Sequence, residues 1–128
     1  MALRPFRVAG AGYGGLIGTA TDVARLVRLH LADGVIDGAR ILAPETARTM
    51  RSIHAPGRPF DHGLGWFRGP ADRFAHPAFV EHWGTGGGFW NAMRLYPDLG
   101  VGIVVMANST RAYDHPTLMA ALLPAFVT

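Results

Sequence analysis

The chain has 128 residues and a mass of 13.7 kDa, which is the size of one ordinary globular domain. Hydrophobic residues make up 49% of it and charged residues 16%, so we expect a buried core and exclude a disordered tail. The apolar runs are short and interrupted by Gly or Pro, which excludes a membrane-spanning helix. The first residues carry no signal-peptide pattern, so we expect a cytoplasmic chain if it is expressed as given.

The charge balance is basic, with a formal net charge of +3 and a sequence pI near 10.2. All twelve basic residues are Arg, and they are spread along the chain without a block or an aromatic-basic pattern. We therefore expect a solvated arginine surface and no nucleic-acid partner. Cys is absent, which excludes disulfides and a thiol nucleophile, and the absence of Lys excludes lysine-based catalysis by this chain alone.

The N-terminal half of the sequence predicts two helices. Thr19 and Asp22 have the spacing of a capping box, and the residues that follow place apolar side chains on one helical face up to Leu31. Gly34 ends this pattern, and residues 35–40 are typical of a short extended turn. A second helix is predicted from Pro44 to about Ser52.

The C-terminal half predicts strands. After a loop over residues 53–62, we expect strands over 63–67, 80–85, 88–96 and 100–108, with a second loop over 69–77. The turn at Pro97–Gly100 predicts an antiparallel hairpin, and the apolar run after Gly100 indicates a strand covered on both faces. Pro116 opens a helix whose Leu118, Met119, Leu122 and Leu123 face the sheet. The predicted class is α+β: one domain, residues 1–128, with helices flanking an antiparallel sheet.

Three patterns have simpler interpretations than a functional one. Gly10–Gly15 matches G-x-G-x-x-G, but no βαβ unit surrounds it, so we expect a glycine-rich approach to the first helix and no cofactor. The six histidines form none of the close pairs that bind zinc, so we expect no metal. The only serines, Ser52 and Ser109, lie in no Ser-x-x-Lys or Gly-x-Ser-x-Gly motif, so neither has local support as a nucleophile.

The segment from His82 to Phe89 carries four glycines within five positions, between two predicted strands. Such a segment gives a ligand close access to backbone N–H groups, with His82 as a neighbouring donor or acid. A flexible hairpin connection without a function explains the same glycines equally well.

The order of these motifs resembles a known family. His82-Trp83-Gly84 and its following glycines, then Tyr96-Pro97-Asp98 and the strand Gly100–Asn108, resemble the C-terminal part of serine β-lactamase-like and penicillin-binding-protein-like hydrolases. The likeness is to the branch with class C β-lactamases, D-amino-acid-releasing peptidases and esterases, and it extends over about residues 8–127. Segments 14–25 and 42–46 resemble the helix entries of that family, and Gly63–Trp66 resembles the strand before its third catalytic motif.

The resemblance implies a partial β-lactamase/transpeptidase-like fold and one border of a serine acyl-transfer site. By this carry-over His82 takes the place of the cationic residue, Gly84 lets substrate lie along the strand edge, and the Thr85 backbone N–H is the oxyanion donor. Trp83 stands where the family has a small hydroxyl residue, which favours an aromatic or ester-type substrate. Trp83, Gly86, Gly87 and Trp90 are the expected substrate-binding residues.

The other two family motifs, Ser-x-x-Lys and Tyr-x-Asn, are absent from the sequence. The first hypothesis is therefore that the chain is a C-terminal part of such a hydrolase and is inactive alone. It would pair with an N-terminal half chain or self-associate as a homodimer. The sequence does not identify the acyl substrate of the parent enzyme. The alternative is a non-catalytic module that binds a small ligand or peptide with the Gly84–Gly88 loop, Trp66, Trp83 and Trp90. Core packing is the simpler role for these three indoles.

Overall fold

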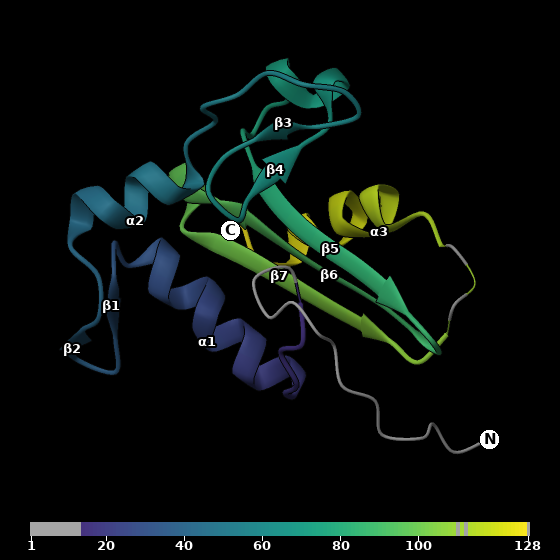
Figure 1. The fold of residues 1–128 in the computed structure, drawn as a ribbon, viewed down its shortest axis with the longest axis horizontal. Coiled ribbons are helices and arrows are strands. Elements are labelled where there is room, and N and C mark those ends of the chain that lie inside the picture. The colour runs from purple at the N-terminus through teal and green to yellow at the C-terminus, as the bar shows by residue number, and fades with distance from the viewer. Residues whose placement is uncertain (1–13, 110, 112, 128) are drawn as a thin grey trace.

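The structure of the protein, a computed structural model, describes residues 14–109, 111 and 113–127. Its centre is an antiparallel five-stranded sheet in the order β3-β4-β5-β6-β7. The strands are β3 (Asp61–His62), β4 (Phe67–Arg68), β5 (Val80–Gly86), β6 (Phe89–Tyr96) and β7 (Val101–Ala107). Helix α1 (Ala20–Leu31) lies across one face of this sheet and α3 (His115–Leu122) across the other (Figure 1). The α+β class with flanking helices is confirmed.

Helix α1 begins where the capping box predicts. The Thr19 hydroxyl accepts a hydrogen bond from the Asp22 N–H, and the Asp22 carboxylate accepts one from the Thr19 N–H, which satisfies two N-terminal donors of the helix. Val27 is the buried residue of this helix that packs on the sheet, against Leu95 and Val80. A Cβ at Gly102 of β7 would lie 2.1 Å from Val27 Cγ1, so the absence of a side chain at this position sets how closely α1 approaches the sheet.

The apolar strand β7 is covered on both faces, as its sequence predicts. Val104 packs in the cluster that contains Val27 of α1, whereas Ile103 packs in the cluster that contains Met119 of α3. The β6–β7 hairpin is also confirmed, with Tyr96 opposite Val101 and Gly100 in the left-handed conformation at the turn. Of the four residues of the C-terminal helix predicted to face the sheet, Met119 belongs to the core cluster on that face, and Leu122 and Leu123 pack against it. Leu118 does not, and it is 37% exposed.

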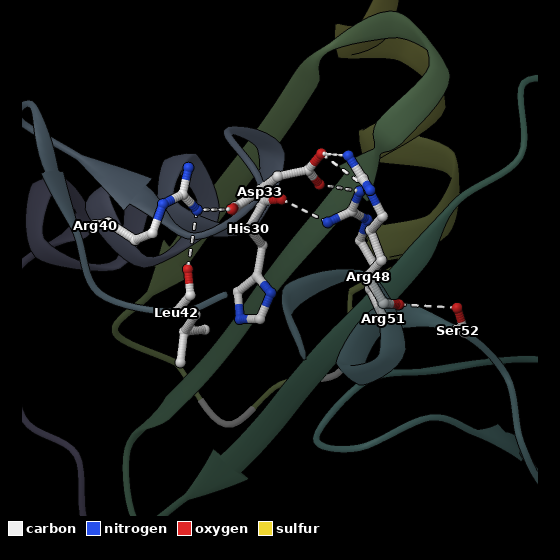
Figure 2. Close-up of polar contacts among 7 residues, drawn as sticks. All are labelled: His30, Asp33, Arg40, Leu42, Arg48, Arg51 and Ser52. Atoms are coloured by element: carbon white, nitrogen blue, oxygen red, sulfur yellow. Dashed lines mark hydrogen bonds and ion pairs between the residues drawn. The ribbon is translucent and has the colours of Figure 1, made fainter. Parts of the chain in front are cut away.

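Helix α2 (Pro44–Arg51) is held against the C-terminal end of α1 by an arginine clamp (Figure 2). Arg48 and Arg51 both donate to the Asp33 carboxylate, and Arg51 Nη1 also donates to the His30 carbonyl at 2.8 Å. These hydrogen bonds hold the pKa of Asp33 below its usual value. Between the helices, β1 (Val35–Ile36) and β2 (Ala39–Arg40) form the short extended turn that the sequence predicts.

One predicted strand is wrong. Residues 63–66 form the loop between β3 and β4, not a strand, and only Phe67 of the predicted segment is in a strand. Gly65 has a φ of 82°, which a regular strand does not allow. Gly63 lies so close to α2 that a Cβ would be 2.5 Å from the Ser52 carbonyl oxygen.

The Gly84–Gly88 segment is also more regular than a loop. Gly84, Thr85 and Gly86 belong to β5 and pair with Asn91, Trp90 and Phe89 of β6. Only Gly87 and Gly88 form the turn, and Gly88 has the positive φ, 112°, that favours glycine. The cross-strand pairing therefore extends the two strands to the turn itself.

Several expectations from the sequence concern residues that the structure does not describe. Most of the Gly10–Gly15 motif lies outside the described residues, and Gly14 and Gly15 belong to neither a helix nor a strand. Within residues 14–109, 111 and 113–127, no helix has the length and apolarity needed to cross a membrane. In the same part of the chain, no three His, Asp or Glu side chains are grouped as metal ligands.

Candidate functional site

The candidate site is the outer side of β5. Strand β4 pairs with β5 only at Phe67 opposite Glu81, although β5 continues to Gly86. Among the described residues, no strand covers residues 82–86 on the side away from β6. This stretch contains the three residues for which the family resemblance implies a place at the border of a catalytic site, His82, Gly84 and Thr85.

His82 is exposed on the α1 side of the sheet and is held by a backbone oxygen. Its Nδ1 lies 2.9 Å from the carbonyl oxygen of Gly65, in the β3–β4 loop. A carbonyl oxygen only accepts hydrogen bonds, so Nδ1 carries the proton and donates. In neutral His82 the lone pair is therefore on Nε2, which has no hydrogen-bond partner among the described residues. The Phe67 ring lies against the imidazole, with 5.2 Å between ring centroids.

Gly84 lies two residues along the strand from His82, on the same face of the sheet. A Cβ at Gly84 would contact no atom of the described residues within 4 Å, so these residues leave the space above this glycine open. Gly86, the next residue on that face, is different, because a Cβ there would lie 2.4 Å from the Phe89 ring. The accessible stretch on this face is thus centred on Gly84, with His82 at one end and the Phe89 ring at the other.

The backbone of Thr85 points to the open side of β5. Gly86 and Phe89 flank a two-residue turn and form a hydrogen-bonded pair, and the direction of hydrogen bonding alternates along the strand. The N–H of Thr85 therefore points away from β6, toward the side that β4 leaves uncovered. The Thr85 hydroxyl donates to the Phe89 carbonyl at 2.9 Å, which leaves the backbone N–H as the donor available at this edge.

Trp83 and Trp90 project to the opposite face from His82. Their indoles stack on each other at 5.5 Å with an interplanar angle of 16°, next to the His115 ring. Trp66 is buried on the α1 face of the sheet with Val27, Val80 and Leu95. The fold therefore does not bring Trp66 together with Trp83 and Trp90, as the alternative of an aromatic binding module requires.

A buried ion pair supports β5 at the position before His82. Arg94 of β6 donates from Nε and Nη2 to Glu81 Oε2, at 3.0 and 2.7 Å, and both side chains are almost fully buried. The guanidinium also lies over the Phe79 ring, 3.9 Å from its centroid. Because both charges are satisfied by each other, the pair fixes β5 against β6 where the open edge begins.

The two serines have structural roles. The Ser52 hydroxyl donates to the Arg48 carbonyl at the end of α2, at 2.8 Å. The Ser109 hydroxyl accepts from the Arg111 N–H at 3.1 Å, a turn contact of the kind that the sequence predicts. Both hydroxyls are thus engaged with the backbone around them.

Comparison with known proteins decides the family. A family model described as Beta-lactamase matches residues 2–125. The chain belongs to the beta-lactamase family. Among individual proteins, "Penicillin-binding protein 4" of Amycolatopsis lactamdurans is 36% identical in an alignment 107 residues long, which covers 75% of this chain and 26% of that protein. "Protein Rv1367c" of Mycobacterium tuberculosis (strain ATCC 25618 / H37Rv) is 54% identical over 39 residues, 30% of this chain and 10% of that protein.

Solved structures of this fold agree with the assignment. SurE in its crystal structure with D-Leu has a TM-score of 0.67 and 32% identity, over 88% of this chain and 27% of that chain. The octameric penicillin-binding protein homologue from Pyrococcus abyssi has the same fold, with a TM-score of 0.65, 18% identity and coverage of 84% and 24%. The beta-lactamase-family chain described here thus spans about a quarter or less of the length of these proteins.

Sequence reasoning located His82 but not what holds it. The strand predicted over residues 63–67 would use the Gly65 carbonyl within the sheet, so the sequence does not predict its contact with His82. The two glycines of Gly-Leu-Gly-Trp are the signal that could have predicted a loop, since glycine inside a strand pattern indicates a bulge or a close approach of another backbone.

Proposed function

We propose that this chain forms one border of a serine acyl-transfer site, in a hydrolase of the esterase, peptidase or β-lactamase type. In this proposal the Thr85 N–H donates to the oxyanion, His82 donates to or accepts from the substrate or its leaving group, and Gly84 leaves room for substrate along the strand. Of the expected substrate-binding residues, Gly86 and Gly87 lie at the substrate end of the strand, whereas Trp83 and Trp90 support it from the opposite face of the sheet. The attacking serine and its lysine activator come from another polypeptide segment, because the chain has no Lys.

The observation that carries this proposal is the open side of β5. A substrate carbonyl needs a donor aimed at the position where negative charge develops, on an accessible strand and not inside a paired one. Two observations support the Thr85 N–H in this role: β4 stops pairing at Glu81, and no described atom would lie within 4 Å of a Cβ at Gly84. His82 lies on the adjacent accessible face, with Nε2 unengaged among the described residues.

The proposal is tested by measuring hydrolysis by the chain alone and by the chain combined with an N-terminal family segment. The purified chain alone should hydrolyse 4-nitrophenyl esters and nitrocefin at the rate of the blank. Mixing or co-expressing it with an N-terminal family segment that carries Ser-x-x-Lys and Tyr-x-Asn should restore turnover, and restoration should fail with a segment whose serine is replaced by Ala. Two results would contradict the proposal: hydrolytic activity that co-purifies with the chain alone, or an N-terminal segment that is equally active with and without the chain.

We further propose that the outer edge of β7 is where a partner chain or a second copy adds. Residues 101–107 carry no charged side chain, and no described strand pairs with their outer edge. Met106 of this strand is 39% exposed and Phe126 near the C-terminus 57% exposed. A light-scattering mass of two or more copies at micromolar concentration is expected for the chain alone, and a monomer mass would count against this partner surface.

A further inference from the structure

The loop that holds His82 is itself anchored to α2 and to the core, and one hydrogen bond closes it internally. The Leu64 N–H donates to the Met50 carbonyl at the end of α2, at 2.8 Å, and the Gly63 N–H donates to the Trp66 carbonyl at 2.7 Å. The Trp66 side chain is 3% exposed and fixes the end of the loop in the core. The Gly65 carbonyl, between these anchors, therefore has little freedom to move relative to α2.

The anchor residue Trp66 is in turn held by α1. The His30 ring meets the Trp66 ring edge to face, with 5.1 Å between centroids and an interplanar angle of 81°. His30 is 3% exposed, and its carbonyl accepts from Arg51 of the arginine clamp (Figure 2). A continuous series of contacts thus runs from the α1–α2 junction through Trp66 and Gly65 to the imidazole at the open edge.

We propose that Trp66 and His30 are positioning residues for His82. This role rests on the proposed function: the two residues keep the Gly65 carbonyl where it accepts from Nδ1–H, so that the lone pair of Nε2 stays available on the face that His82 shares with Gly84. The imidazole then keeps one tautomer and one ring orientation without a carboxylate partner. The chain contains an opposite case, since His54 places Nε2 at 2.7 Å from the Thr49 carbonyl and so carries its proton on Nε2.

The tautomers of single histidines can be read from the ¹⁵N shifts of their ring nitrogens at a pH where the rings are neutral. In the unmodified chain we expect His82 to be Nδ1–H and His54 to be Nε2–H. His76, which is exposed and has no hydrogen bond among the described residues, supplies the shifts of an unconstrained ring. An Nε2–H tautomer at His82, or shifts equal to those of His76, would overturn the proposal.

Two variants test the anchoring. Gly63→Ala pushes the loop away from α2, because the new Cβ would lie 2.5 Å from the Ser52 oxygen and 2.8 Å from the Met50 oxygen. Trp66→Phe keeps an aromatic ring in the core but reduces its contact with His30, because the phenyl ring is smaller than the indole. Each should move the His82 shifts toward those of His76 and leave the His54 shifts unchanged. Gly14→Ala is the matched control, since its Cβ would meet no described atom within 4 Å.

The readout separates this inference from the proposed function. If the variants fold by circular dichroism and His82 stays Nδ1–H in both, positioning by Trp66 is refuted whether or not the reconstituted hydrolase is active. If the variants shift the tautomer but no hydrolysis is ever restored, the proposed function fails and the anchoring stands. In an active reconstituted enzyme, Trp66→Phe should lower kcat more than it changes KM, and it should displace the pH profile.

Discussion

The contact between Gly102 of β7 and Val27 of α1 can be tested by measuring how substitutions there change the free energy of unfolding. In Gly102→Ala, the added Cβ would lie 2.1 Å from Val27 Cγ1 and 3.3 Å from Leu31 Cδ1. Carbon atoms in contact prefer separations of about 3.5–4.0 Å, so α1 has to retreat by roughly 1.5 Å or Val27 has to leave its rotamer. Overpacking of this kind costs about 1–3 kcal/mol, against roughly 0.5–1 kcal/mol that alanine returns over glycine in a strand. We expect a net loss of about 1–2 kcal/mol.

Urea unfolding of the unmodified chain, Gly102→Ala, Val27→Ala, their double variant and one control variant measures the effect. Val27→Ala alone should lose about 2 kcal/mol for two buried methyl groups and the space they leave. In the double variant the new methyl at position 102 occupies that space, so the loss should fall short of the sum of the singles by at least about 1 kcal/mol. Gly84→Ala, on the same face with no described atom within 4 Å of its Cβ, is the matched control and should not destabilise the chain. Additive losses, or a stabilised Gly102→Ala, would refute the packing described here.

Two further outcomes are expected. Gly34→Ala should lower the free energy of unfolding by more than about 1 kcal/mol, because Gly34 has a φ of 89° and a Cβ would lie 2.3 Å from the Leu42 oxygen. Gly38→Ala should cost clearly less, because Gly38 has a similar φ of 79° but no described atom within 4 Å of a Cβ. Equal urea midpoints for the two variants would contradict this. Burial, and secondarily the Arg51 charge, lower the pKa of His30, so the unfolded chain binds more protons and stability should fall as the pH drops below about 6.5. His30→Phe should lose part of that slope between pH 7.5 and 5, and identical slopes would show that His30 does not contribute to it.

Local signals account for much of what the sequence predicted. The capping box at Thr19 and Asp22 defines the start of α1 through contacts three residues apart, and the Pro97–Gly100 turn defines the register of β6 and β7. Such features need no knowledge of the rest of the fold, which is why they were predicted correctly. The order of His82, Gly84 and Thr85 along one strand was also readable, since it depends only on sequence spacing.

The remaining features depend on contacts between distant segments. Glu81 has the sequence pattern of a surface charge, yet it is buried because Arg94 lies opposite on β6 and α3 covers that face. The loop at Gly63–Trp66 has the pattern of a strand until α2 is placed against it. The same holds for the bond between His82 and the Gly65 carbonyl, which joins residues 17 apart in sequence.

The backbone donor at position 85 is the most direct test of the account. Thr85→Pro removes the N–H on the open side of β5, where an edge strand tolerates proline, while Thr85→Ala keeps the N–H and loses only the hydroxyl contact with Phe89. In the hydrolase reconstituted with an N-terminal segment, kcat for a 4-nitrophenyl ester should be roughly 100- to 1000-fold lower for Thr85→Pro than for Thr85→Ala. Equal kcat values in two variants that fold and associate alike would contradict the assignment of an oxyanion donor to this strand.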